Sequence, residues 1–360
     1  MSKRPPDNAR RISVPSTFIL AVASACALAV AIAATVLFGA PSLAQATADS
    51  AANRAAAATP TARAVAAKGT SRIAPAVPRV GIRTFVAPRG IRVASNLTYG
   101  TASDGQALKL DVCSPAAEPG TEPGASAAVS LPAVLSIHGG SWSHGDKSST
   151  DWHAVCEWLA SEGFVAYSVD YRLVPTVRFP APIDDVTRAL EWVREPQNVE
   201  RFNIDPRRIG VFGGSAGGNL AALLGMRGHG DIHTGTRVAA VAELSGPVDL
   251  TASGQRLGNP SEYLRSIELA YLGCTEFDSC QAASAASAVS YVDPSDPPVF
   301  IGGSDTELVP VEQGTSFAAA LAAAGVPHTL RIDTGHWHSI ATLNAPMRTA
   351  VAAFLHEYLG

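Results

Sequence analysis

Apolar runs alternate with helix-forming segments along the chain from about residue 90 onward. Two central runs, 132–138 and 164–170, are almost wholly apolar, as is typical of strands buried on both faces of a parallel sheet. The runs at 91–99 and 107–113 are separated by turns, with no helix between them, which predicts an antiparallel hairpin at one edge of the sheet. We expect strands at 91–99, 107–113, 132–138, 164–170, 208–212, 238–244, 298–302 and 328–332, and helices at 150–161, 183–194, 216–226, 311–324 and 343–358.

This alternation predicts an α/β fold with a doubly wound, mostly parallel sheet of eight strands. One segment, 247–295, interrupts the pattern with Pro247, Pro260 and a tract rich in Ala and Ser. Because it follows the strand at 238–244, it is expected to overhang the carboxyl ends of the strands, where ligands bind in such sheets. We interpret it as a cap or lid, and a plain surface excursion is the alternative.

The beginning of the chain has the pattern of an export signal. Basic residues precede an uncharged apolar run at 18–38, and an A-x-A site ends at Ala46. We therefore interpret 1–46 as a cleaved signal peptide. The apolar run is long enough to span a bilayer, so a retained membrane anchor is the alternative. Residues 47–89, rich in Ala, Thr and Pro, are interpreted as a flexible linker, and 90–360 as the catalytic domain.

Charge is distributed unevenly along the chain. The formal net charge is −4, while residues 1–80 carry nine Lys or Arg against two Asp or Glu. The remaining residues are therefore clearly acidic, and no basic stripe with interleaved aromatic residues occurs in them. This pattern argues against a nucleic-acid partner. We expect no metal and no cofactor.

Cysteine usage fits an exported protein. Cys274 and Cys280 enclose five residues of a polar loop, which favours a local disulfide. A zinc site is a weaker interpretation, because no histidine stands at ligand spacing nearby. Cys113 and Cys156 either pair with each other or remain buried thiols, and the sequence leaves both interpretations open.

The segment 213–218, Gly-Gly-Ser-Ala-Gly-Gly, carries the strongest chemical signal. It lies between the expected strand at 208–212 and the expected helix at 216–226, so Ser215 would stand on a sharp strand-to-helix turn. That is the G-x-S-x-G nucleophile elbow, which exposes the serine hydroxyl. Glycines on both sides permit the strained turn.

A serine hydroxyl needs a base and an orienting acid, which follow a nucleophile elbow in the order acid, then histidine. Asp305 stands just beyond the strand at 298–302 and is our preferred acid, with Glu307 and Asp249 as rivals. Histidine 338, just before the last helix, is the preferred base. His336 is its alternate, with a flanking role in the pocket if His338 is the base.

An oxyanion hole needs two preorganised N–H donors. Ala216, at the start of a helix, would supply one. The second is expected from the loop after the third strand, His138-Gly139-Gly140-Ser141-Trp142, where Gly139 or Gly140 would donate. Glycines allow the backbone to approach a substrate closely at these positions.

Together these motifs resemble the α/β-hydrolase family, and most closely its carboxylesterase branch with an HGG oxyanion motif, which includes hormone-sensitive-lipase-like and feruloyl-esterase-like enzymes. The resemblance covers about residues 90–360 and implies ester hydrolysis through an acyl-serine intermediate. The sequence departs from the family pattern Asp-x-Leu-Val-Pro, because extra residues precede Leu308-Val309-Pro310, and this keeps Glu307 in contention as the acid. The resemblance is carried by His138-Gly139-Gly140, Asp170-Tyr171-Arg172, 213–218, Gly303-Ser304-Asp305 and Gly335-His336-Trp337-His338.

The sequence thus predicts an exported serine hydrolase that cleaves small-molecule carboxylic esters through Ser215, Asp305 and His338. An amide hydrolase, either an arylformamidase or a peptidase, is the first alternative, because the same machinery serves both reactions. A non-catalytic surface binding protein on the same scaffold is the second. Contact with a membrane is expected only if residues 18–38 are retained.

Overall fold

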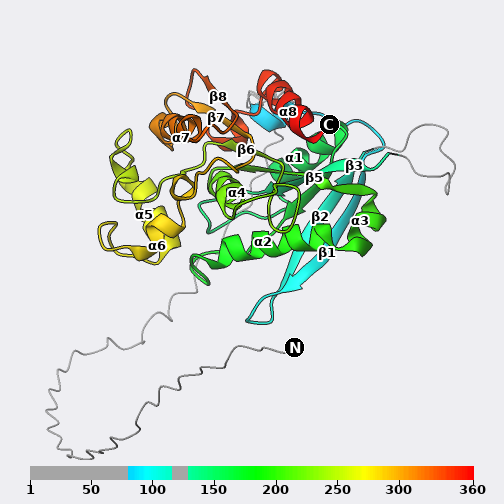
Figure 1. The fold of residues 1–360 in the computed structure, drawn as a ribbon, viewed down its shortest axis with the longest axis horizontal. Coiled ribbons are helices and arrows are strands. Elements are labelled where there is room, and N and C mark those ends of the chain that lie inside the picture. Colours follow the sequence, from blue (N-terminus) through cyan, green and yellow to red (C-terminus); the bar gives the residue numbers. More distant parts are fainter. Residues whose placement is uncertain (1–79, 116–128) are drawn as a thin grey trace, which may run out of the picture. The chain divides into compact units, whose positions relative to one another are not determined.

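A single twisted sheet organises the part of the chain that the computed structural model describes, residues 80–115 and 129–360 (Figure 1). The eight strands lie in the order β1-β2-β4-β3-β5-β6-β7-β8. β2 is antiparallel to β1 and to β4, and all other neighbours are parallel. The predicted α/β sheet with a hairpin at one edge is confirmed. The strands are β1 Arg92–Thr101, β2 Ala107–Ser114, β3 Leu131–Ile137, β4 Val165–Val169, β5 Ile204–Gly214, β6 Ala240–Leu244, β7 Val299–Ser304 and β8 His328–Asp333.

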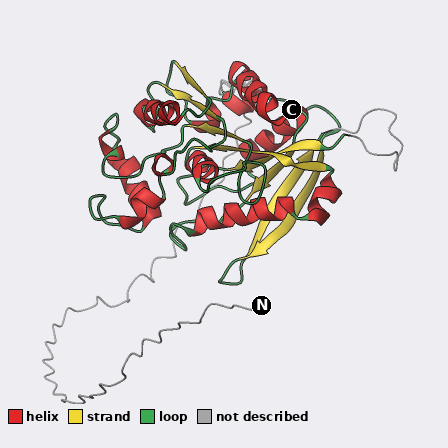
Figure 2. Cartoon of the chain, in the orientation of Figure 1, coloured by secondary structure: helices red, strands yellow, loops and turns green. Residues whose placement is uncertain are grey.

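Helices cover both faces of this sheet and enclose two apolar cores (Figure 2). Side chains of β3 alternate between them: Leu135 and Ile137 join the core under α2, α4 and α7, whereas Val134 joins the core under α1 and α8. This alternation follows from the two-residue period of a strand. The helices are α1 Thr150–Ser161, α2 Ala181–Arg194, α3 Pro196–Phe202, α4 Ala216–Met226, α5 Glu262–Leu272, α6 Gln281–Ala285, α7 Val311–Ala324 and α8 Ala345–Leu359.

Residues 247–295, interpreted from sequence as a cap, contain α5 and α6 and pack beside the helical layer. The side-chain amide of Asn219 in α4 donates hydrogen bonds to the carbonyl oxygens of Pro247 and Ala286, at 2.9 and 3.1 Å. The carbonyl oxygen of Tyr271 in α5 accepts from the backbone N–H of Phe179 at 2.9 Å. These contacts fix both ends of the segment to the body of the domain.

The folded body begins earlier than the predicted boundary at residue 90. A short 3-10 helix, η1 Gly81–Thr84, buries Ile82 in the core beneath α1 and α8, where its side chain is 1% exposed. Arg348 of α8 donates to the carbonyl oxygen of Gly81 at 3.3 Å. The last ten residues of the proposed linker therefore belong to the domain. The sequence gives no signal that these residues are folded, because a single buried isoleucine forms no periodic pattern.

Two disulfides are present among the described residues. Cys274–Cys280 closes the loop after α5, as predicted, and Cys113–Cys156 joins β2 to α1, which resolves the question that the sequence left open. Within the described ranges, every helix is too short or too polar to cross a bilayer. The proposed signal peptide and its run at 18–38 lie outside the described residues.

Candidate active site

Ser215 stands at the turn between β5 and α4, as the elbow motif predicts. Its backbone has φ 57° and ψ −124°, in a region that non-glycine residues rarely adopt. A Cβ atom at Gly217 would overlap the carbonyl oxygens of Ile137 and His138 on the neighbouring strand end. Glycine is therefore required beside the serine, because the helix starts in direct contact with β3.

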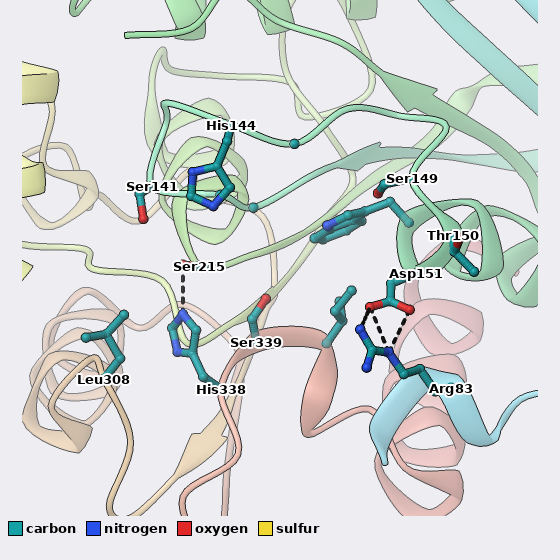
Figure 3. A pocket seen from close by; sticks show the side chains of 15 residues that line it. Arg83, Ser141, His144, Ser149, Thr150, Asp151, Ser215, Leu308, His338 and Ser339 are labelled. Carbon is teal, nitrogen blue, oxygen red and sulfur yellow. Dashed lines mark hydrogen bonds and ion pairs between the residues drawn. The ribbon is translucent and has the colours of Figure 1, made fainter. Parts of the chain in front are cut away.

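The structure places His338 against this serine. The Nε2 atom of His338 lies 2.8 Å from the Ser215 hydroxyl oxygen (Figure 3). His338 lies in the loop between β8 and the 3-10 helix η4 Ser339–Ala341. The alternate, His336, is exposed and packs its ring on Trp337, with centroids 4.5 Å apart. The geometry thus brings together the preferred nucleophile and the preferred base.

The acid that reaches the imidazole is Glu307 rather than Asp305. Glu307 accepts a hydrogen bond through Oε2 from Nδ1 of His338. Its other oxygen, Oε1, accepts from the backbone N–H of Ser304 and from the hydroxyl of Ser245, both at 2.8 Å. The Glu307 side chain is 2% exposed. With Nδ1 donating to the carboxylate, Nε2 is the nitrogen that can accept the serine proton.

This corrects our expectation for Asp305. Its carboxylate accepts hydrogen bonds from the backbone N–H of Gly335, at 2.9 Å, and from the hydroxyl of Thr306, at 2.8 Å. These bonds, the one from Gly335 foremost, lower the pKa of Asp305. The physical reason lies in the loop, because β7 extends to Ser304 and Asp305 then serves the turn while Glu307 folds back under the imidazole.

The other rival acid, Asp249, also serves a local turn. Its Oδ1 atom accepts from the backbone N–H and the hydroxyl of Thr251, at 3.0 and 2.6 Å. The sequence did contain a signal for Glu307, namely the extra residues before Leu308. The position of Asp305 at the end of a strand outweighed that signal, but its hydrogen bonds go to Gly335 and Thr306 and not to the imidazole.

The glycines proposed for the oxyanion hole lie beside the serine. Gly139 and Gly140 line the same cavity as Ser215 and His338, and a Cβ atom at Gly139 would come within 3.2 Å of the Ser215 Cβ atom. Ala216 is the first residue of α4, where backbone N–H groups favour negative charge. The role of these three residues as oxyanion donors stays a prediction.

A buried aromatic pair supports the glycine loop from below. The ring of His138 stacks on Tyr171 with centroids 4.3 Å apart, and the Tyr171 hydroxyl donates to the His138 carbonyl oxygen at 2.9 Å. Burial lowers the pKa of His138 to about 4. At neutral pH this imidazole is therefore uncharged and acts as a fixed support for Gly139 and Gly140.

The cavity at Ser215 has a volume of about 520 Å³, and its wall combines polar side chains with apolar surface (Figure 3). On one side Arg83 of η1 and Asp151 of α1 form a bidentate ion pair, with N···O distances of 2.9 and 2.7 Å. The residues that line the cavity include none from 247–295. The structure therefore favours a surface excursion for that segment over a lid on this cavity.

Two contributors to the site were missed from sequence. Ser245, directly after β6, donates to Glu307 and accepts from the backbone N–H of Ser339 at 2.9 Å. Arg83 reaches the cavity wall from residues 80–89, which the sequence alone assigns to the linker. Neither residue belongs to a motif, and only the folded chain brings them to the site. In the described ranges, no group of three or more His, Cys, Asp or Glu is arranged to hold a metal.

The sheet order, the serine elbow and the histidine after the last strand together define an α/β-hydrolase. Comparison with known families agrees: the BD-FAE family model matches residues 123–321, more than half of the chain. The chain belongs to the BD-FAE family. The resemblance inferred from the motifs is confirmed at this level.

Individual relatives carry esterase names. Esterase LipQ of Mycobacterium tuberculosis is 31% identical over 64% of this chain and 55% of its own length. Neutral cholesterol ester hydrolase 1 of mouse is 42% identical, but the match covers 26% of this chain and 23% of the mouse protein. Among solved structures, an acetyl ester-xyloside bifunctional hydrolase from Caldicellulosiruptor lactoaceticus superposes with a TM-score of 0.58 at 25% identity, covering 76% of this chain and 99% of that one.

Proposed function

We propose that this protein is a serine carboxylesterase that hydrolyses small-molecule esters. The observation that carries the proposal is the continuous hydrogen-bonded line from the Ser215 hydroxyl through the imidazole of His338 to the carboxylate of Glu307. Three side chains from distant parts of the sequence meet in the order that nucleophilic catalysis requires. The esterase names of the relatives support the same reaction class.

In the proposed reaction, the Ser215 oxygen attacks the ester carbonyl carbon while His338 Nε2 takes the hydroxyl proton. Glu307 holds the imidazole in position and stabilises the imidazolium that forms. The tetrahedral intermediate collapses when His338 returns the proton to the leaving alcohol. Water then attacks the acyl-serine, again with His338 as base, and releases the acid.

The negative oxygen of the tetrahedral intermediate would be stabilised by backbone N–H groups of Ala216 and of Gly139 or Gly140. Their positions beside Ser215 support this role. Loss of one such donor typically costs about 3–4 kcal/mol of transition-state stabilisation. The glycine loop therefore has to be rigid, which is what the stacked His138 and Tyr171 beneath it provide.

Turnover of p-nitrophenyl acetate by Ser215→Ala tests this proposal. We expect kcat to fall by about 10⁴-fold or more with the melting temperature retained, because the nucleophile is lost and the fold is not. Ser279→Ala, on an exposed loop outside the cavity, is the matched control and should keep native turnover. Undiminished hydrolysis by the Ser215 variant would refute the proposal.

We also propose that the protein acts outside the cytoplasm. Two disulfides in the folded body support this, because such bonds persist in oxidising compartments. If residues 1–46 are a cleaved signal, N-terminal sequencing of the exported protein will give a chain that begins at Thr47. Recovery of an exported chain that still contains residues 18–38 would instead favour a membrane anchor.

A further inference from the structure

A second carboxyl group lies beneath the proposed active site and takes no part in the reaction described above. Glu243 is on β6, two residues before the turn that carries Ser245, and only 1% of it is exposed. Its Oε2 atom accepts a hydrogen bond from the backbone N–H of Gly246 at 2.7 Å. A buried carboxyl group requires a reason, because an unpaired buried charge is costly.

The Glu243 carboxyl group fits a space that two glycines leave open. A Cβ atom at Gly246 would lie 2.8 Å from its Oε2 atom, and one at Gly218 would lie 3.2 Å away. Gly218 belongs to the first turn of α4, directly after Ser215. The carboxyl group is therefore enclosed between the helix that follows the nucleophile and the turn that follows β6.

The turn held by Glu243 is the one that positions the acid of the proposed triad. Ser245 donates to Glu307 Oε1 at 2.8 Å and accepts from the backbone N–H of Ser339 at 2.9 Å. The backbone of Ser245 is left-handed, with φ 56°. A small cavity of about 20 Å³ is lined by Glu243, Ser245 and Glu307 together. By holding the turn at Gly246, Glu243 thus supports Glu307 and also Ser339, the residue directly after His338.

The electrostatic surroundings of Glu243 disfavour a negative charge. The neighbouring strands present Gly213 and Ile301 opposite Glu243, and α4 presents Gly218. The charged group that acts on Glu243 is the carboxylate of Glu307, beyond which lies His338. Burial raises the pKa of Glu243 to about 8 and outweighs the hydrogen bond from the Gly246 N–H, which lowers it; repulsion by Glu307 adds to the effect of burial.

We propose that Glu243 is a positioning residue that works as a neutral carboxylic acid: it holds the Ser245–Gly246 turn in place and leaves Glu307 as the single negative charge behind His338. A neutral acid can accept the Gly246 N–H hydrogen bond without setting two carboxylates against each other. This inference rests on the proposed function for its kinetic consequences. Its consequence for stability is independent of catalysis.

The kinetic test compares Glu243→Gln with Glu243→Ala, using p-nitrophenyl acetate from pH 5 to pH 9. The alanine variant should lose about tenfold or more in kcat, because the turn under Glu307 loses its support and small displacements in an active site are costly. The glutamine variant, which keeps a neutral acceptor for Gly246, should restore kcat to within about threefold of native.

The acid limb of kcat/KM reports the ionisation state of Glu243. If Glu243 is neutral, Glu243→Gln removes no charge, so the midpoint of the acid limb stays at the native value. A shift of that limb to lower pH in the glutamine variant would show that Glu243 is ionised and would overturn the proposal. Native kcat in Glu243→Ala would equally overturn it, because the carboxyl group would then position nothing.

The stability test needs no turnover, so it also separates failure of this inference from failure of the proposed function. The folded-state pKa of Glu243, about 8, lies above the ordinary value of 4.5. The stability that its proton contributes is therefore fully present below pH 4.5 and is lost as the pH rises to 8. Relative to Glu243→Gln, the native melting temperature should fall across this window and then level off.

The control for the stability test is Glu200→Gln on the exposed surface of α3, whose melting temperature should follow the native one at every pH. If Glu243→Gln also follows the native curve in parallel from pH 5 to pH 8, Glu243 is ionised throughout and the proposal is wrong. Because the glutamine substitution is isosteric, this comparison remains informative even if Glu243→Ala fails to fold.

Discussion

An imidazole 2.8 Å from a serine hydroxyl becomes a base only when its other nitrogen is held as a donor. In this protein Glu307 provides that constraint, and its own second oxygen is fixed by Ser304 and Ser245. Asp305 stands two residues away, yet its hydrogen bonds hold the turn at Gly335 and Thr306. At the residue scale, the path of the loop after β7 therefore decides which of the two carboxylates contacts His338.

The two neighbouring carboxylates give a matched pair of variants. We expect Glu307→Gln to lower kcat for p-nitrophenyl acetate by about 10³–10⁴-fold, because the imidazole loses both its orientation and its stabilising charge. Asp305→Asn, which removes a charge of the same sign nearby, should change kcat by less than about threefold, because an exposed charge is screened by solvent. The opposite ranking of the two variants would restore Asp305 as the acid.

The site residues that could be predicted are those marked by a local sequence pattern. Ser215 needed glycines on both sides, so the local sequence was sufficient to locate it. The position after the last strand narrowed the base to His336 and His338, and the contact with Ser215 distinguishes His338. Glu307 and Asp305 have the same chemistry and nearly the same position, and only the length of β7 separates their roles. Ser245 could not be found, because nothing in the sequence distinguishes it from other serines at strand ends.

At the scale of elements, prediction succeeded for all eight strands and for five of the helices, α1, α2, α4, α7 and α8. The wholly apolar strands and the long helices were found, and α1, α4 and α7 have the bounds that the pattern gave. Helices α3, α5 and α6 were missed. The segment that contains α5 and α6 is held by contacts with residues distant in sequence. Asn219, for example, holds the segment that contains them through two carbonyl oxygens. Such contacts have no periodic signature.

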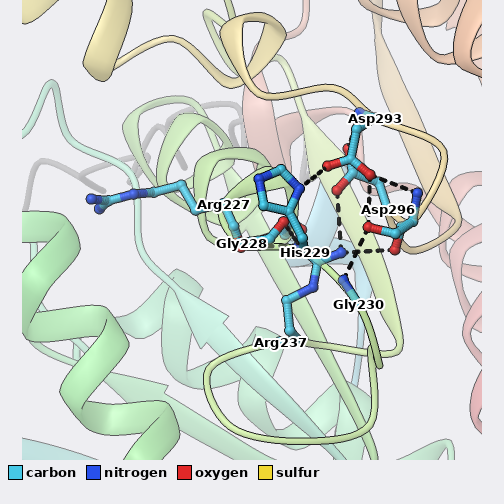
Figure 4. Close-up of polar contacts among 9 residues, drawn as sticks. Arg227, Gly228, His229, Gly230, Arg237, Asp293 and Asp296 are labelled. Carbon is cyan, nitrogen blue, oxygen red and sulfur yellow. Dashed lines mark hydrogen bonds and ion pairs between the residues drawn. The ribbon is translucent and has the colours of Figure 1, made fainter. Parts of the chain in front are cut away.

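A buried ion pair fastens the loop after α4 to the segment before β7 (Figure 4). Arg237 pairs with Asp296 at 3.2 Å and donates to the carbonyl oxygens of Gly228 and Ser295, both at 2.8 Å. Because this guanidinium keeps its carbonyl partners, Asp296→Asn should lower the free energy of unfolding by about 1–3 kcal/mol in a urea titration, less than the loss expected for an isolated buried pair.

The nearby pair of His229 and Asp293 provides the control for this prediction. The His229 side chain is 81% exposed, so the pair is screened by solvent and contributes little. His229→Ala should therefore change the free energy of unfolding by less than about 1 kcal/mol. Equal losses in the Asp296 and His229 variants would show that burial of the Arg237 pair is not what stabilises this corner of the domain.

At the scale of the whole molecule, the described residues all fall within one compact unit, Ile73–Gly360. Within the eight-stranded sheet, Ser215 follows the carboxyl end of β5, Glu307 follows that of β7 and His338 follows that of β8. Fold class was predictable because the alternation of apolar strands and helix-forming segments extends over the domain on both sides of 247–295. The beginning of the domain was not predictable, because residues 80–89 are held by tertiary contacts such as the burial of Ile82 beneath α1 and α8.

The same limit applies to the segment 247–295. Position in the chain suggested a lid, whereas the structure packs the segment beside α4 and leaves the cavity at Ser215 to be walled by η1, α1 and the glycine loop. The ion pair of Arg83 and Asp151 contributes charged groups to this wall, and the shape of the cavity comes from these elements. Chain order alone does not determine which of several loops reaches a site.

The central claim is that Ser215 is a nucleophile activated by its neighbours, and covalent labelling tests it most directly. A fluorophosphonate should add one phosphonyl group to the native protein, located by mass spectrometry on the peptide that contains Ser215, and none to Ser215→Ala. Folded native protein that stays unlabelled, or that carries the label on another residue, would contradict the account.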